Sequence, residues 1–390
     1  MKEAVIVSCA RTAVGKAFKG SLVNTRPDEL MATVLKACVE RSGIVPEAIE
    51  DVIVGCAMPQ DEQGMNLGRI ALLKAGFPVS VPGMTINRFC SSGLQSVALA
   101  CERVQAGGAE VILAGGVESM SMVNFLTGRM HPDAALFAQS PNTYLSMGVT
   151  AENVALKYGI SREECDQFAL ESNLKAATAI SSGKFKDEIV PVTVTRRQPG
   201  PDGKVHTKSF NFDTDEGPRA NSTIEGLGKI RPAFSPKGVS TAGNSSQVSD
   251  GAAAVLVTSK EFAKANSLPI MATFKGFQVA GVPPEIMGIG PSYAVPKLMD
   301  KSGFKISDIK TIELNEAFAT QSLAVIRDLD LNKEIVNPNG GAIALGHPLG
   351  CTGAKLTVSA IHEAKRKGGG LALVTMCIGG GMGAAGLFEV

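Results

Sequence analysis

The sequence has almost no excess of charge of either sign. Its 390 residues include 38 lysines and arginines and 37 aspartates and glutamates, which gives a formal net charge of +1 at pH 7. A protein that binds nucleic acid over a broad surface usually carries a basic excess. The composition therefore gives no electrostatic reason to expect nucleic acid as a partner.

A long apolar run is also missing at the start of the chain. The first residues, MKEAVIVSCARTAVG, place two charged side chains before a short apolar run. That run is too short to span a bilayer, and it lacks the longer apolar core and the cleavage site of a secretory signal. We therefore expect no membrane association and a cytoplasmic location.

The cysteines do not form closely spaced pairs. The eight of them stand at positions 9, 38, 56, 90, 101, 165, 351 and 377, and none belongs to a C-x-x-C motif. A structural zinc site is therefore not expected, and nothing else in the sequence indicates a metal ion. In a cytosolic chain of this length, most such cysteines are small buried hydrophobic residues.

What the sequence does contain is an internal repeat at an offset of 260 residues. ERSGIVPEAIEDVIV (40–54) aligns with DKSGFKISDIKTIEL (300–314), and GLQSVALACERVQAGGAEVILAGG (93–116) aligns with GAKLTVSAIHEAKRKGGGLALVTM (353–376). Both members of the first pair are typical of helix, turn and strand. Both members of the second are typical of a helix, a glycine break and an apolar strand, as in sheets covered by helices on both faces. The repeat predicts two similar α/β halves.

The segment between the two halves has a different character. It is polar and rich in turns, apart from an amphipathic stretch at 159–183 in which Ser161 and Glu164 have the spacing of a capping box. Inserted loops on rigid scaffolds usually carry ligand specificity. We predict three domains, listed by residue number: an N-terminal core half at 1–119 and 250–271, an inserted loop domain at 120–249, and a C-terminal core half at 272–390.

Cys90 is the first candidate for catalysis. It stands in NRFCSSGLQSVALACERV, directly before Ser91, Ser92 and Gly93, which are typical residues of a helix start. The free N–H groups and the partial positive charge of a helix N-terminus stabilise a thiolate. We therefore predict a lowered pKa and a nucleophilic thiol for Cys90. The alternative is a buried cysteine at a tight turn.

Two further candidates lie in glycine-rich segments near the end of the chain. His347, one of four histidines, stands in VNPNGGAIALGHPLGCTGA, where glycine and proline predict a shaped loop. Cys377 opens CIGGGMGAAG, in which Gly381-x-Gly383-x-x-Gly386 matches a dinucleotide motif. Only Leu387 to Val390 follow, so the helix and the acidic residue of that motif are missing. The glycines fit better with a backbone that offers N–H groups to an oxyanion.

The repeat relates these candidates to one another. His347 lies just upstream of the helix that is equivalent to the one after Cys90, and Cys377 ends a strand equivalent to the one that ends at Gly116. Halves related by approximate two-fold symmetry would bring such ends toward a common centre. A further strand runs into Asn315 and Glu316 in IELNEAFATQ, where the ordinary explanation is a helix cap.

Seven motifs together carry a resemblance to a known family. In order along the chain they are NRFCSSGLQSV, GGVESMS, SMGVTAENVA, AGNSSQVSDGAA, NEAFA, GGAIALGHPLGCTGA and CIGGGMG. On these motifs the chain resembles the thiolases over its whole length, and it is most similar to the degradative 3-ketoacyl-CoA thiolases. The resemblance implies a five-layered α/β core of two similar βαβαβαββ halves, with a loop domain inserted in the first.

The resemblance also implies acyl transfer through a cysteine. Cys90 matches the nucleophile that attacks the keto carbon of a 3-ketoacyl-CoA, after which acetyl-CoA leaves and free CoA takes the acyl group. Cys377 matches the acid and base that protonates the leaving carbanion and deprotonates the incoming thiol. His347 matches the histidine that activates the nucleophile and, with a water held by Asn315, binds a thioester oxygen. The N–H groups of Cys90 and Gly379 match a second oxyanion hole.

For coenzyme A the resemblance implies a co-substrate rather than a tightly bound cofactor. The residues that match positions near CoA are Arg219, Ser246, Met147, Ala242 and Phe318. The family forms homodimers that often pair into homotetramers, so the same is expected of this chain.

The acyl chain length is less directly encoded. Short-chain acetoacetyl-CoA thiolases commonly have histidine before the Met-Gly pair where this chain has Ser146. Gln321 and the Asn-Pro-Asn before Gly340 also resemble the degradative type. These residues favour an enzyme of fatty-acid β-oxidation, with an acetoacetyl-CoA thiolase as the alternative. The segment 130–146 is expected to shape the acyl pocket or the oligomer contacts.

Two other classes fit the residues less well. A decarboxylating condensing enzyme has the same fold, but it carries a histidine where this chain has Cys377. A non-catalytic acyl-CoA-binding protein on the same scaffold would have lost one of the reactive residues. Cys90, His347 and Cys377 are all present.

Overall fold

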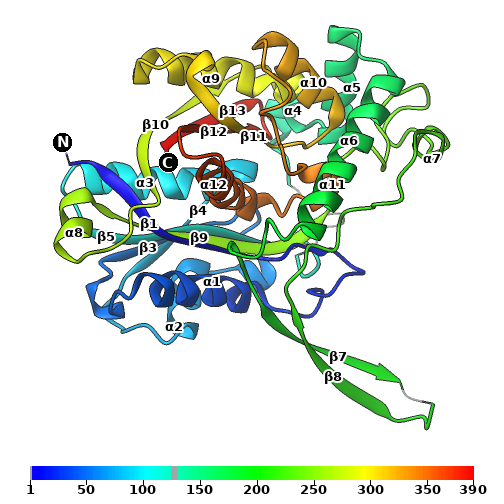
Figure 1. The fold of residues 1–390 in the computed structure, drawn as a ribbon. Helices are drawn as coiled ribbons and strands as arrows, with labels where there is room; N and C mark the ends of the chain where they lie inside the picture. The colour runs from blue at the N-terminus through cyan, green and yellow to red at the C-terminus, as the bar shows by residue number, and fades with distance from the viewer. Residues whose placement is uncertain (1, 124–130, 200) are drawn as a thin grey trace.

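A computed structural model describes residues 2–123, 131–199 and 201–390, and its two halves have similar elements (Figure 1). The N-terminal half comprises β1 (Ala4–Thr12), β2 (Gly15–Lys16), α1 (Pro27–Ser42), β3 (Asp51–Gly55), α2 (Leu67–Lys74), β4 (Gly83–Ile86), α3 (Ser92–Gln105), β5 (Val111–Ser119) and β9 (Ser249–Ser259). After α8 (Lys260–Ala265), the C-terminal half comprises β10 (Ala272–Gly281), α9 (Gly290–Ser302), β11 (Ile309–Leu314), α10 (Ala319–Asp328), α11 (Ala342–Leu345), α12 (Leu349–Arg366), β12 (Leu371–Ile378) and β13 (Met382–Glu389).

The strands of both halves form one hydrogen-bonded path. Its order is β11-β12-β13-β10-β1-β9-β5-β3-β4. The two halves meet at β1 and β10, which pair antiparallel through Val5 with Thr273 and Ile6 with Ala272. Within each half the order along the sheet is the same, with the first strand next to the last. This agrees with the two similar α/β halves that the internal repeat predicted.

The helices and strands stack in five layers. Helices α1 and α2 cover the outer face of the N-terminal strands, α3 and α12 lie between the two sets of strands, and α9 and α10 cover the C-terminal strands (Figure 1). Every residue of β5, β9 and β12 is buried. Strands with helices on both faces need apolar residues throughout, which explains the near-continuous apolar runs in the sequence. The five-layered α/β core expected from the resemblance is confirmed.

The C-terminal half differs from the βαβαβαββ pattern in one detail. Its third strand is reduced to a single bridge, in which Val336 pairs parallel with Ile312. The next residue, Asn337, has φ +44°, and Pro338 has no N–H to donate. The chain therefore leaves the sheet edge after one residue instead of extending along it.

The segment between β5 and β9 forms helices and a long hairpin. Its elements are α4 (Ala134–Gln139), α5 (Met147–Tyr158), α6 (Arg162–Ser181), β6 (Ile189–Val190), β7 (Val192–Pro199), β8 (Val205–Phe212) and α7 (Ile224–Gly228). The β7–β8 hairpin projects away from the core (Figure 1). The capping box of α6 is confirmed, because Ser161 and Glu164 exchange hydrogen bonds of 3.2 and 2.9 Å. Of the segment 130–146, residue 130 lies outside the described residues.

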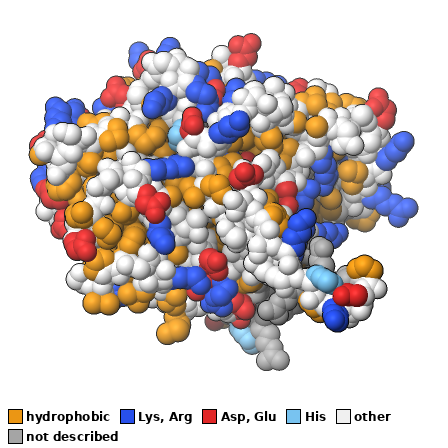
Figure 2. All heavy atoms as spheres, turned by 60° about the horizontal axis from the view of Figure 1, so that its bottom comes forward, with side chains coloured by type: hydrophobic (Ala, Val, Ile, Leu, Met, Phe, Trp, Pro, Cys, Tyr) orange, Lys and Arg blue, Asp and Glu red, His pale blue; other side chains and the backbone are white. Residues whose placement is uncertain are grey.

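On the face that Figure 2 shows, basic and acidic side chains are intermixed and no large area of one sign stands out. This agrees with the balanced composition. Within the described parts of the chain, no helix combines the length and the apolar character needed to cross a bilayer.

Candidate active site

Cys90 lies on a strained turn directly before α3. It belongs to a one-turn 3-10 helix, Phe89–Ser91, and Phe89 has φ +43°, which a non-glycine residue rarely adopts. Hydrogen bonds hold this turn: the Phe89 N–H donates to the Asn87 side chain at 2.8 Å, and the Ser92 hydroxyl donates to the Phe89 carbonyl at 2.7 Å. The turn therefore places the Cys90 thiol at the N-terminus of α3 in a fixed position.

The N-termini of α3 and α12 meet because glycine removes side chains from the contact. A Cβ atom on Gly93 would lie 2.7 Å from the carbonyl oxygen of Gly350, and one on Gly353 would lie 2.3 Å from the backbone nitrogen of Leu94. Real Cβ atoms do not approach so closely, so any other residue would push the helices apart. This contact brings the Cys90 turn next to the loop that carries His347.

His347 sits in the loop between α11 and α12, where the sequence predicted it. Its backbone N–H donates to the carbonyl of Gln247 at 3.0 Å, and its Nδ1 lies 2.6 Å from Thr352 Oγ1. The Thr352 hydroxyl donates to the Pro348 carbonyl at 2.9 Å. Because that hydroxyl proton is already engaged, Nδ1 carries the ring proton and donates it to Thr352. The Nε2 atom is left with a lone pair that can accept a hydrogen bond or a proton.

The environment of His347 keeps its ring neutral. Burial lowers the pKa of His347 to about 3, with a further contribution from the positive charge of Lys355. The ring is therefore unprotonated at neutral pH, and Nε2 is available as a proton acceptor.

Asn315 extends from the end of β11 to the same place. Its Nδ2 lies 3.3 Å from His347 Nε2 and donates to that lone pair. Its Oδ1 is buried and has no hydrogen-bond partner among the described residues. A buried amide oxygen without a partner is costly, and this one is free to accept from a bound water or substrate. The expectation of a helix cap is wrong here, because α10 begins at Ala319 and its N-cap residue is Phe318.

Cys377 and Gly379 lie where β12 turns into β13. Cys377 is buried, and Gly380 and Gly381 adopt φ of +80° and +86° in the turn. A strand follows this turn directly, so no helix begins where a dinucleotide motif would require one. Hydrogen bonding by the Gly379 N–H lowers the pKa of the Cys90 thiol, which favours its ionised form.

The predicted low pKa of Cys90 is wrong for the free protein. Burial raises the pKa of Cys90 to about 11, although the N–H groups of Gly379 and of Cys90 itself lower it, and the buried carboxylate of Glu118 raises it further. Burial, and to a lesser degree the nearby Cys90, also raises the pKa of Cys377. The helix N-terminus is present as predicted, but desolvation has the larger effect. Both thiols are therefore protonated at rest, and Cys90 needs a base.

Alkylation of the free protein should show this high pKa. Only the thiolate reacts with iodoacetamide, so the rate of Cys90 modification should rise about tenfold per pH unit between pH 6 and 9, without a plateau. Quantifying the modified Cys90 peptide by mass spectrometry at each pH measures this rate. A rate that levels off below pH 8 would show that the helix N-terminus outweighs burial after all.

The residues matched to CoA fall into two groups. Met147 and Phe318 pack with Cys377 in one apolar cluster, and the Ser246 backbone N–H donates to the carbonyl of Ala317 at 2.9 Å. Ala242 is exposed in the loop that leads to Ser246. Arg219 is exposed elsewhere, before α7, where its backbone N–H donates to the Asn173 side chain at 3.0 Å. Two of the five therefore belong to the apolar cluster of Cys377, and Ser246 and Ala242 lie in a loop that is bonded to this cluster through Ala317.

Two residues of the site were missed from the sequence. Thr352 fixes the tautomer of His347, and Glu118 at the end of β5 accepts the N–H groups of Gly350 and Ala57 at 2.7 and 2.9 Å. Glu118 thereby holds the first turn of α12 close to the Cys90 side of the core. An acidic residue inside an otherwise apolar buried strand was the available signal for Glu118.

Metal ligation has no support from the described side chains. In residues 2–123, 131–199 and 201–390, no group of three or more histidine, cysteine, aspartate or glutamate residues is arranged to hold a metal ion.

Comparison with known proteins identifies the family over the whole chain. The family model described as "Thiolase, N-terminal domain" matches residues 4–261, and "Thiolase, C-terminal domain" matches residues 268–390. The 3-ketoacyl-CoA thiolase of Bacillus subtilis (strain 168) is 54% identical over 390 residues, which cover 100% of both chains.

Other relatives have a different name. The acetyl-CoA acetyltransferase of Chromobacterium violaceum is 45% identical over 395 residues, covering 98% of each protein. The crystal structure of the Bacillus anthracis acetyl-CoA acetyltransferase superposes with a TM-score of 0.91 at 42% identity, covering 100% of this chain and 99% of that one. Both family models and all three relatives agree on one point: the chain belongs to the thiolases, which are acyltransferases.

Proposed function

We propose that the protein is a 3-ketoacyl-CoA thiolase, which uses CoA to cleave a 3-ketoacyl-CoA into acetyl-CoA and an acyl-CoA shorter by two carbons. The observation that carries this proposal is a pair of neighbouring buried thiols, Cys90 before α3 and Cys377 on β12, with a neutral His347 in the loop before α12, the helix that packs against α3. Carbon–carbon cleavage beside a thioester needs a soft nucleophile, a separate proton donor and sites for two oxyanions.

The first half of the reaction forms an acyl-enzyme. Nε2 of His347 accepts the proton of Cys90, and the thiolate attacks the keto carbon of the substrate. The N–H groups of Cys90 and Gly379 stabilise the resulting oxyanion. The bond between C2 and C3 then breaks, and its electron pair goes to the departing acetyl-CoA carbanion, which takes a proton from Cys377.

The second half releases the shortened product. Cys377, now a thiolate, accepts the proton of free CoA, and the CoA thiolate attacks the acyl group on Cys90. The Cys90 sulfur leaves and regains its proton from the His347 imidazolium. In both half-reactions, protonated His347 and a water bound to the free Oδ1 of Asn315 bind a thioester oxygen. Each residue ends in the protonation state in which it began.

We also propose that five residues bind CoA: Arg219, Ser246, Met147, Ala242 and Phe318. The apolar cluster of Met147, Phe318 and Cys377 supports contact with the pantetheine end, because it adjoins the second thiol. The domain boundaries at 119/120, 249/250 and 271/272, the homodimer or homotetramer and the cytoplasmic location stay predictions.

The degradative role is favoured over acetoacetyl-CoA metabolism by residues near the site. Ser146 is exposed at the N-cap of α5, where a short-chain enzyme commonly has histidine, and Gln321 is buried in the first turn of α10. The names of the Chromobacterium and Bacillus anthracis relatives support the alternative, a short-chain acetyl-CoA acetyltransferase that condenses two acetyl-CoA molecules.

A comparison of substrate lengths separates the two roles. We expect kcat/KM for 3-ketooctanoyl-CoA to exceed that for acetoacetyl-CoA by at least about tenfold, because each additional buried methylene contributes roughly 0.8 kcal/mol. The loss of 3-ketoacyl-CoA on addition of CoA is followed for both substrates. Ser146→His is the matched variant and should move the preference toward acetoacetyl-CoA. Turnover of acetoacetyl-CoA alone would assign the protein to the short-chain class.

A further inference from the structure

The carboxylate of Glu316 is buried beside the candidate site, and the chemistry above does not use it. Glu316 follows Asn315 in the link between β11 and α10, and only 2% of its surface is exposed. It accepts three hydrogen bonds: from the Ser172 hydroxyl at 2.7 Å, from Asn337 Nδ2 at 2.8 Å and from the Ile343 N–H at 3.2 Å. A carboxylate in this position costs desolvation energy, which these bonds offset in part.

The three donors come from three separate segments of the chain. Ser172 belongs to α6, Asn337 follows the bridge at Val336, and Ile343 belongs to α11, four residues before His347. Asn337 also fixes the end of β11, because its side chain accepts from the Leu314 N–H and donates to the Leu314 carbonyl, both at 2.8 Å. Glu316 is the point at which these segments meet.

The backbone before His347 rests directly on this carboxylate. A Cβ atom on Gly341 would lie 2.1 Å from the carboxyl carbon of Glu316, and the Gly341 N–H donates to Ser172 Oγ at 3.1 Å. The segment from Gly341 to Ile343 therefore has one position relative to Glu316. Since Asn315 is the neighbour of Glu316 in the chain, the same carboxylate fixes both sides of the Asn315–His347 contact.

We propose that Glu316 is a positioning residue, which keeps the side chain of Asn315 and the loop of His347 at the relative positions that catalysis requires. This inference rests on the proposed thiolase reaction, in which these two side chains bind a thioester oxygen. Displacement of these two groups would weaken that oxyanion site and leave the Cys90 turn in place, because Asn87 and Ser92 hold that turn. The loop of Ser246 is bonded to the backbone of Ala317, next to Glu316 in the chain, and not to the Glu316 carboxylate.

The negative charge, and not only the shape, is required for this role. All three partners donate hydrogen bonds, and a carboxylate is the side chain that only accepts them. A glutamine would turn its NH2 group toward one of the donors, so one hydrogen bond would be replaced by a repulsive contact. The isosteric change Glu316→Gln therefore disturbs the three hydrogen bonds at this position with little change of side-chain volume.

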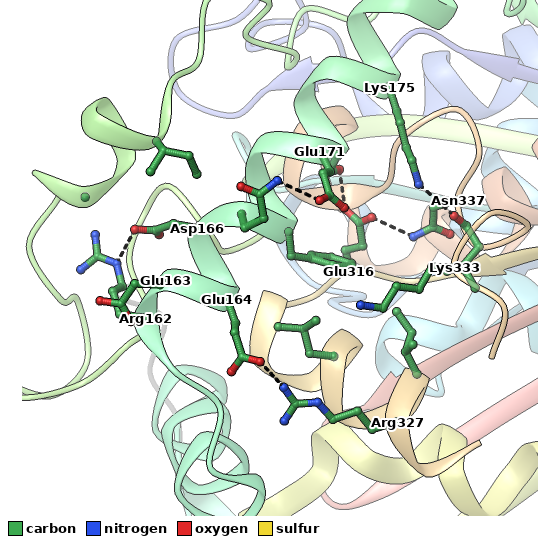
Figure 3. A pocket seen from close by; sticks show the side chains of 18 residues that line it. Arg162, Glu163, Glu164, Asp166, Glu171, Lys175, Glu316, Arg327, Lys333 and Asn337 are labelled. Carbon is green, nitrogen blue, oxygen red and sulfur yellow. Dashed lines mark hydrogen bonds and ion pairs between the residues drawn. The ribbon is translucent and has the colours of Figure 1, made fainter. Parts of the chain in front are cut away.

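A cavity of about 570 Å³ reaches Glu316 from the side of α6, α7 and α10. Figure 3 shows Glu316 between Asn337 and α6 at this cavity, with Lys333 and Arg327 nearby. Cys90, His347 and Cys377 are not among the residues that line it. A small carboxylate such as formate can therefore approach position 316 without passing through the site of the reaction.

Kinetics of three variants test the proposal. We expect Glu316→Gln and Glu316→Ala to lower kcat for thiolysis about 10- to 100-fold, since a displacement of catalytic groups by about 1 Å can cost that much. The KM for CoA and the alkylation rate of Cys90 should stay within about threefold. Formate should restore part of kcat in Glu316→Ala, whereas chloride at the same ionic strength should not. Glu163→Gln, on the wall of the same cavity, should leave kcat unchanged.

Circular dichroism and thermal unfolding establish that each variant is folded. If Glu316→Ala does not fold, Ser172→Ala removes one donor and should lower kcat by a smaller factor. A folded Glu316→Gln with kcat within twofold of the unmodified protein would overturn the inference. So would an equal loss of kcat and of CoA affinity. Failure of the proposed function is distinct, because the unmodified protein itself would then show no thiolysis.

Discussion

Replacement of Cys90 by serine should reduce kcat for thiolysis by at least about 10⁴-fold. A serine hydroxyl is far less acidic than a thiol, and the neutral His347 that suffices to deprotonate a thiol does not suffice for an alcohol. Cys377 is a neighbouring thiol on β12, but it is needed as the proton donor. The rate is measured by the loss of 3-ketooctanoyl-CoA absorbance after addition of CoA.

Cys101 provides the matched control for this substitution. It lies on α3, the same helix that begins after Cys90, and it is fully buried in the core. Cys101→Ala should lower the unfolding temperature slightly and leave kcat unchanged. Retention of substantial thiolysis by Cys90→Ser, with Cys101→Ala behaving normally, would remove Cys90 from the role of nucleophile.

Replacement of His347 by alanine should reduce kcat about 10³-fold. The change removes both the base for Cys90 and one of the donors to a thioester oxygen, and each such role typically contributes a factor of 10² to 10⁴. Because burial lowers the pKa of His347 to about 3, the histidine is already neutral throughout pH 6–8. The loss should therefore be the same at pH 6 as at pH 8, as measured by single-turnover formation of acetyl-CoA.

His206 serves as the control for a histidine far from the site. It lies on the projecting hairpin, and 60% of its side chain is exposed. His206→Gln should have the kinetics of the unmodified protein. If His347→Ala kept kcat within tenfold, another group would have to activate Cys90. If its loss became much smaller on lowering the pH from 8 to 6, His347 would be gaining a proton in that range and the assigned neutral state would be incorrect.

The architecture could be predicted from the sequence because each repeated piece shows its own secondary structure and the pieces recur at one regular offset. Helix, break and strand recur at one offset, and each piece is long and apolar enough to indicate its own structure. The capping box of Ser161 and Glu164 needed no tertiary information either, since both residues belong to one turn of helix. The reduced third strand of the C-terminal half was missed, although Asn337 and Pro338 were its signal.

The electrostatics of the site could not be predicted in the same way. The helix start after Cys90 can be inferred from four consecutive residues, but the depth of burial depends on α12 and β12, which lie far away in the chain. A local rule therefore gave the wrong direction for the pKa of Cys90. Glu316 illustrates the same limit, because its three donors come from residues 172, 337 and 343 and become neighbours only in the fold.

The central claim is that Cys90 carries the acyl group between the two half-reactions. Its most direct test is to mix the protein with 3-ketooctanoyl-CoA without free CoA, quench with acid and determine the mass of the Cys90 peptide. The account predicts a hexanoyl group on Cys90 in stoichiometric amount, with release of one acetyl-CoA, and its disappearance when CoA is added before the quench. An unmodified Cys90 together with released acetyl-CoA, or a hexanoyl group on Cys377 instead, would contradict it.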